Sequence, residues 1–261
     1  MNGIFFAFLG TLFTFAITTL GAAGIFFVKN EHDPRLQCTF LGFAGGVMTA
    51  ASIWSLLLPG IEHAEENGQI GWLVITGGFI LGVVTLLIAD KFVMNWYQKK
   101  QKEQLPIKKG SLMLVAAITA HNIPEGMSVG LAFALAAQND FEPAMLMSAV
   151  ALAVGIAIQN FPEGTAVALP LVENGMRKST AFFIASMTAI VEPVFGVLAA
   201  IFASFVQSTI ALCLAFAAGT MIYVVVEELI PESHGNDNGK NGTLGFMIGF
   251  LIMMILDVAL S

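Results

Sequence analysis

The chain has 261 residues, of which 57% are hydrophobic and only 11% are charged, with a formal net charge of −7 and a mean hydropathy of +0.82. Soluble domains carry about 25% charged residues, so this composition excludes an ordinary soluble domain and indicates an integral membrane protein. The acidic balance argues against nucleic acid as a partner, and no basic patch is rich enough to suggest one.

Eight apolar stretches follow one another along the chain, and each is near or above the ~20 residues that a helix needs to cross the hydrocarbon core. They run over residues 3–28, 36–59, 70–94, 111–137, 143–171, 179–204, 207–231 and 243–260. The first lacks a basic leading segment and is longer than the apolar core of a signal peptide, so we interpret it as a membrane helix. The sequence predicts an all-α polytopic membrane protein with eight transmembrane helices, folded as a single transmembrane domain over residues 1–261.

The basic residues lie at or in loops that have odd numbers when counted from the N-terminus. They are Lys29, Arg35, Lys91, Lys99, Lys100, Lys102, Lys108, Lys109, Arg177, Lys178 and Lys240. The even-numbered loops carry acids instead, among them Glu62, Glu66 and Asp140. The positive-inside rule then puts the odd loops in the cytoplasm and both termini outside it.

A six-residue phrase occurs twice inside these apolar stretches. Residues 121–126 read H-N-I-P-E-G, and residues 159–164 read Q-N-F-P-E-G. Each phrase puts a Glu within a predicted span, where a charged side chain costs about 3 kcal/mol on insertion scales. Two such costly groups at matched positions predict a shared polar site.

The residue types in the two phrases favour a metal ion at that site. On a helix, His121 and Asn122 each lie one turn before Glu125 and share its face. The second phrase repeats this spacing with Gln159, Asn160 and Glu163. One imidazole, two carboxylates and several amide oxygens suit a divalent transition metal such as Zn²⁺.

Prolines add to the polar character of both helices. Pro124 and Pro162 cannot donate backbone hydrogen bonds, which leaves the carbonyls of residues 120 and 158 as further oxygen ligands for a cation or water. A third acid, Glu192, precedes Pro193 within the sixth stretch. Polar clusters also end the second and seventh stretches, and these either attract cations to the two mouths of a path or are simply solvated helix ends. Their members are Pro59, Glu62, His63, Glu227, Glu228, Pro231, Glu232 and His234.

The polar residues of the two phrases also fit roles other than metal transport. His121 taken alone could bond a neighbouring backbone group, and the acids could be protonated and bonded across helices. An intramembrane metalloprotease would need an H-E-x-x-H motif, which the sequence lacks. A proton-coupled carrier or channel for another solute also fits the acids, but the two-helix ligand set favours a metal transporter over this carrier and over an enzyme.

The paired H-N-x-P-E-G and Q-N-x-P-E-G phrases resemble the fourth and fifth helices of ZIP zinc transporters, and the chain is most similar to their bacterial GufA-like branch. The resemblance covers essentially the whole chain. It implies one transmembrane transporter domain with a 3+2+3 inverted-repeat arrangement, an elevator-like motion, a homodimer, and a place in the cell (plasma or inner) membrane. Metal would move toward the cytoplasm.

The resemblance also implies a two-metal centre bridged by glutamates. His121, Glu125 and Glu163 would take one metal ion. The second ion would lie among the same two glutamates and three further side chains, namely Asn122, Asn160 and Glu192. The ion is expected to be Zn²⁺ as the transported substrate, with Cd²⁺, Fe²⁺, Mn²⁺ or Co²⁺ as alternatives.

Two positions bear on metal preference. Met48 matches a position on the second helix of the family where a thioether can ligate the first metal, although a lone Met in an apolar span is also an ordinary packing residue. Gln159 stands where other branches of the family have a His. The ligand set therefore contains fewer soft ligands.

Overall fold

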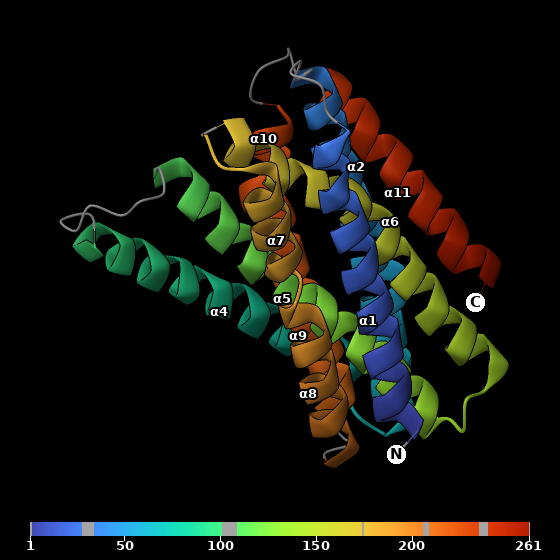
Figure 1. The fold of residues 1–261 in the computed structure, drawn as a ribbon. Coiled ribbons are helices and arrows are strands. Elements are labelled where there is room, and N and C mark those ends of the chain that lie inside the picture. Colours follow the sequence, from blue (N-terminus) through green and yellow to red (C-terminus); the bar gives the residue numbers. More distant parts are fainter. Residues whose placement is uncertain are drawn as a thin grey trace.

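The computed structural model describes residues 2–27, 34–100, 109–173, 175–205, 209–234 and 240–260, and all regular structure within these ranges is helical (Figure 1). The elements in chain order are α1 (Asn2–Ala23), the 3₁₀ turn Gly24–Phe26, α2 (Pro34–Ala51), a π-helical turn (Ser52–Leu57), α3 (Leu58–Glu66), α4 (Gly71–Lys100), α5 (Lys109–Gln138), α6 (Pro143–Glu173), α7 (Lys178–Thr188), α8 (Val191–Phe205), α9 (Ile210–Val224), a second π-helical turn (Val225–Leu229), α10 (Ile230–Ser233) and α11 (Lys240–Leu260). The predicted all-α class is confirmed.

Within the described residues, seven segments are long and apolar enough to cross a membrane. They are Gly3–Phe26, Cys38–Glu66, Gly71–Ala89, Pro143–Val172, Lys178–Ala203, Ile210–Ser233 and Lys240–Ala259. Each overlaps one of the predicted stretches. The remaining stretch, 111–137, falls in α5, which is 30 residues long. The chain is therefore a polytopic membrane protein.

The predicted stretch 179–204 is not one continuous helix. α7 ends at Thr188 and α8 begins at Val191, so the path turns at Ala189 and Ile190. Pro193 explains the break, because in a continuous helix its ring would clash with the carbonyl of Ala189, four residues earlier. In the first turn of a new helix the missing N–H of proline costs nothing.

The second and seventh stretches each contain a π-helical turn just before a proline. The N–H of Leu58 donates to the carbonyl of Ile53, and the N–H of Ile230 donates to that of Val225, five residues back in each case. Such a widened turn accommodates the proline that follows without ending the helix. The second stretch therefore continues to Glu66, and the acids predicted for the following loop lie on α3.

The helices form two groups by their packing, and Figure 1 shows α4 at one side of the bundle and α11 at the other. In the first helix group α1 packs along α6, and α5 packs along α8, with α7 against α6. In the second helix group α2 packs along α11, and α4 packs along α9, with α3 and α10 as the ends of the two π-containing spans. The groups meet mainly where α6 contacts α2 and where α5 contacts α9.

Glycines bring the paired helices into backbone contact. A Cβ on Gly42 of α2 would collide with the carbonyl of Gly242 on α11, and one on Gly249 would collide with that of Phe43. A Cβ on Gly82 of α4 would likewise collide with the carbonyl of Phe216 on α9. Small residues allow this close approach in membranes, where packing rather than the hydrophobic effect holds helices together.

Large apolar side chains cover the outside of the bundle, as lipid contact requires. Phe5 on α1, Trp72 on α4 and Val258 on α11 are 59%, 68% and 63% exposed. Asp257, also on α11, is instead buried and accepts a hydrogen bond of 2.6 Å from Ser55 Oγ. This bond joins α11 to the π-helical turn of the second span.

Candidate metal centre

The two motif phrases lie on α5 and α6, and both helices continue through their prolines. Each proline lies on a different helix face from the Glu that follows it, since successive residues are about 100° apart on a helix. Ala120 and Pro124 line an apolar crevice, and Ile158 and Pro162 line another. The carbonyls at 120 and 158 thus belong to residues that line these crevices, and their use as metal ligands stays a prediction.

The polar side chains of the two phrases are buried together inside the first helix group. Asn122, Glu125, Gln159 and Asn160 are completely buried, and Glu163 is 6% exposed. Only paired or hydrogen-bonded polar groups persist at such depth without a large energetic cost. His121 lies on α5 one residue before Asn122, and its side chain falls outside the part of the structure that is described.

A chain of hydrogen bonds links three helices through these side chains. Gln159 Nε2 donates to Glu125 Oε1, which ties α6 to α5. The same Nε2 lies 3.3 Å from Asn160 Oδ1. Asn160 Nδ2 in turn donates to Glu192 Oε1 at 3.0 Å, which ties α6 to α8. The two amides therefore stand between two carboxylates and hold them in one cluster.

Glu192 reaches the cluster because of a glycine and a helix break. A Cβ on Gly126, the last residue of the first phrase, would collide with the backbone of Glu192, so α5 and α8 touch at this point. The break before Val191 places Glu192 in the first turn of α8. There the positive end of the helix dipole favours a negative side chain.

The last glycine of the second phrase has the matching role toward α1. A Cβ on Gly164 would collide with the carbonyl of Thr18. Thr14 and Thr18 lie within hydrogen-bonding reach of the Glu192 carboxyl. Their hydroxyls also bond α1 carbonyls, at 2.9 Å to Thr11 and 3.1 Å to Thr14 respectively. Sequence reasoning missed these threonines, although Thr11, Thr14 and Thr18 recur at helical spacing in an apolar span.

Three carboxyl groups share this interior. Glu163 is close enough to both Glu125 and Glu192 to interact with them electrostatically. Like charges repel strongly where the local dielectric constant is low. The cluster therefore has to hold protons or a cation to be stable, and a divalent ion between the carboxylates would satisfy this need.

Several atoms of the cluster have no hydrogen-bond partner and are buried. They are both amide atoms of Asn122, Glu125 Oε2, Gln159 Oε1 and Glu192 Oε2. Buried polar atoms are normally satisfied, so the oxygens among these atoms are available to bind something that is not part of the chain. Carboxylate and amide oxygens are donors that divalent cations accept.

Other predicted ligands are less closely tied to the cluster. Met48 is completely buried among apolar side chains on α2, in the second helix group. Among the described side chains, no three His, Cys, Asp or Glu residues converge tightly enough to form a metal site by themselves. A site built from the described side chains alone would therefore use the amides of the cluster as well as its carboxylates.

Comparison with known proteins gives a consistent result over the whole chain. The family described as "ZIP Zinc transporter" matches residues 4–111 and 100–257. "Zinc transporter ZIP11" of Homo sapiens is 32% identical over 340 residues, covering 100% of this chain and 98% of the relative. "Zinc transporter GufA" of Myxococcus xanthus is 33% identical, covering 94% of each chain.

A third relative, "Zinc transporter ZIPB" of Bordetella bronchiseptica, is 35% identical, covering 98% of this chain and 82% of the relative. The animal and bacterial relatives are thus about equally similar to this chain. These matches agree with the predicted family. Their similar identities do not show whether the chain is closer to the GufA-like branch or to ZIP11.

Proposed function

This chain belongs to the ZIP zinc transporter family, and from that premise we propose that it moves Zn²⁺ toward the cytoplasm through a two-metal site in the first helix group. Its family is one of zinc transporters rather than enzymes. Zn²⁺ is the substrate, and Cd²⁺, Fe²⁺, Mn²⁺ and Co²⁺ are the alternatives that its ligand types would also accept.

One observation carries the proposal. The hydrogen-bonded chain from Glu125 through Gln159 and Asn160 to Glu192 gathers carboxylates from two helices around amides from a third. It still leaves Glu125 Oε2, Gln159 Oε1 and Glu192 Oε2 without partners. A purely structural network would use these atoms, since each unsatisfied buried group costs about 1–3 kcal/mol.

We assign separate ligand sets to the two metals. His121, Glu125 and Glu163 bind the first ion, with Met48 as a further ligand. The second ion binds the two glutamates and three further side chains, namely Asn122, Asn160 and Glu192. Glu125 and Glu163 bridge the ions, which fits their electrostatic contact and the neutralisation that the shared interior demands.

The division into two helix groups supports an elevator-like motion. All proposed ligands except Met48 lie on α5, α6 and α8, which belong to the first helix group. Motion of this group along the second would carry the bound metal across the membrane, and contact with Met48 would then change between states. The matched π-helical turns before Pro59 and Pro231 support the 3+2+3 inverted repeat, because they recur in the second and seventh spans.

Orientation and assembly complete the proposal. The basic residues at odd loops support extracytoplasmic termini in a cell membrane. We propose a homodimer embedded in the lipid bilayer, which cross-linking in native membranes would reveal as a species of twice the monomer mass.

The direct test is uptake of radiolabelled Zn²⁺ into proteoliposomes that contain the purified chain. Glu125→Ala serves as the inactive form, and Glu142→Gln, which removes an exposed acid from a turn, serves as the matched control. We expect uptake by the native chain and by Glu142→Gln, with none above empty liposomes for Glu125→Ala. Equal uptake by all three proteins would contradict the assigned site.

A further inference from the structure

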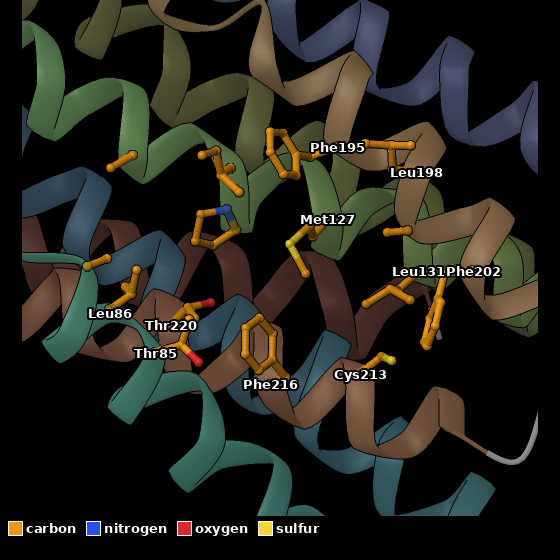
Figure 2. A pocket seen from close by; sticks show the side chains of 15 residues that line it. Thr85, Leu86, Met127, Leu131, Phe195, Leu198, Phe202, Cys213, Phe216 and Thr220 are labelled. Carbon is orange, nitrogen blue, oxygen red and sulfur yellow. The ribbon is translucent and has the colours of Figure 1, made fainter. Parts of the chain in front are cut away.

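An apolar crevice opens on the side of the bundle where the two helix groups meet (Figure 2). Its volume is about 560 Å³, and its walls come from α4, α5, α8 and α9. In Figure 2, Met127 of α5 lies between Phe195 of α8 and Phe216 of α9. Cavities of about 300–1,000 Å³ hold small molecules in proteins, so this one is large enough for a ligand.

The lining offers water few polar partners. Its hydroxyl groups belong to Thr85 and Thr220, which donate hydrogen bonds of 2.7 Å to the carbonyls of Leu81 and Ala217 on their own helices. Water enters a cavity only where it finds two or more polar partners. The crevice therefore favours an apolar occupant over water.

The mouth of the crevice faces the lipid rather than an aqueous end of the bundle. Leu198 and Phe202, at its edge on α8, are 53% and 52% exposed. Both lie in the membrane-spanning segment Lys178–Ala203, and Thr85 on the opposite wall lies in Gly71–Ala89. The lining thus continues into the apolar surface that the bilayer covers.

A second, smaller crevice repeats the arrangement on the other motif helix. Its volume is about 240 Å³, and it lies between α6 of the first helix group and α2 and α11 of the second. Pro162 lines it, as Pro124 lines the larger one. Each motif helix therefore presents its polar face to the carboxylate cluster and its proline face to an apolar crevice between the helix groups.

We propose that the larger crevice is a lipid site, which takes one acyl chain of a phospholipid from the surrounding bilayer. A chain seated there contacts Met127 and Phe195 on the first helix group and Phe216 on the second. It fills the space through which the two groups would have to slide past each other. The lipid acts as a removable spacer at the back of the helix that carries Glu125.

The test uses a phosphatidylcholine with a photoactivatable diazirine near the end of one acyl chain, incorporated into liposomes with the full-length protein. Irradiation followed by peptide mass spectrometry maps the adducts. Two variants fill the crevice from opposite walls, Ala199→Phe on α8 and Cys213→Phe on α9. Val194→Phe, which introduces the same side chain on the exposed face of α8 outside the lining, is the matched control.

We expect adducts concentrated on Met127, Phe195 and Phe216 in the native chain and in Val194→Phe. Both filling variants should lose these adducts and keep those on exposed positions such as Trp72. Size-exclusion profiles establish that each variant is folded, and a single folded filling variant suffices. The proposal would be overturned if the crevice residues carried no more adducts than Trp72, or if the filling variants kept the same adducts as the native chain. The measurement requires no metal transport, so it stands or falls independently of the proposed function.

Discussion

Asn160 on α6 donates a hydrogen bond to Glu192 on α8 across 3.0 Å, and this contact joins a motif helix to a helix that starts anew inside the membrane. The amide thus has two tasks. Its nitrogen holds Glu192 in place, and its oxygen lies 3.3 Å from Gln159 Nε2, next to the proposed metals.

Replacement of Asn160 by Ala should lower both stability and zinc binding. The variant leaves a buried carboxylate oxygen without its donor, at a cost of about 1–3 kcal/mol. Thermal unfolding in detergent, with and without Zn²⁺, measures both effects. Ile158→Val on the exposed side of the same helix is the control. If Asn160→Ala had the same melting temperature and the same zinc-induced shift as this control, the role of the amide would be refuted.

The three glutamates should differ in their effect on transport. Glu125→Ala and Glu163→Ala each remove a bridge and should abolish uptake, because two cations would then face each other with less negative charge between them. Glu192→Gln keeps the shape of the side chain, removes one charge and should reduce uptake only in part. Metal analysis of the purified protein should show a fall from two ions toward one for Glu192→Gln. Retention of two tightly bound ions by that variant would refute the assignment.

Uptake should fall as the external pH is lowered. Carboxylate and imidazole ligands must lose their protons before they bind metal, so protons compete with zinc at the site. The clustered acids titrate together, and no single substitution should remove the whole pH dependence. Initial rates at subsaturating Zn²⁺, with the internal pH held constant, test this expectation, and a flat profile would count against it.

The two motif glycines should not tolerate a methyl group. Gly126→Ala and Gly164→Ala push α5 from α8 and α6 from α1, and overpacking of this kind costs about 1–3 kcal/mol. Gly77→Ala on α4 is the control, since a Cβ there meets nothing within 4 Å. We expect lower melting temperatures and reduced uptake for the motif variants alone. Normal behaviour of Gly126→Ala would show that the α5 and α8 backbones are not locked together.

The orientation can be tested by labelling of single cysteines. In a background without Cys38 and Cys213, a cysteine at Asn67 should react with an impermeant maleimide from outside intact cells. A cysteine at Gln101 should react only after permeabilisation. Reaction of both positions from one side would exclude the proposed arrangement of the spans.

Much of this architecture follows from local patterns in the sequence. Apolar length predicts the spans, because a hydrocarbon core of fixed thickness sets the length of each helix. The spacing of Asn122 and Glu125, and of Asn160 and Glu163, predicts that each pair shares a helix face, and the structure buries all four together. Polar groups are costly to bury in a membrane, so those that occur inside an apolar stretch stand out as candidates for a site.

Other features depend on contacts between distant segments, which no local pattern specifies. Thr14 and Thr18 approach Glu192 where α1 packs against α8, and a Cβ on Gly196 of α8 would collide with the Thr11 side chain there. The turn at Ala189 falls within a single predicted span, although Pro193 is its cause. Pro124 and Pro162 line the crevices rather than the cluster. The sequence does not reveal this, because packing decides which neighbour each face of a helix meets.

The glycine contacts between α2 and α11 have a consequence for biogenesis. Gly42 and Gly242 belong to segments near opposite ends of the chain, so α2 leaves the ribosome and enters the membrane long before its partner exists. Until α11 is inserted, the glycine-lined face of α2 is open to lipid or to other nascent helices. The second helix group is therefore completed last, and a chain that stops before Lys240 would leave the translocon with this face uncovered.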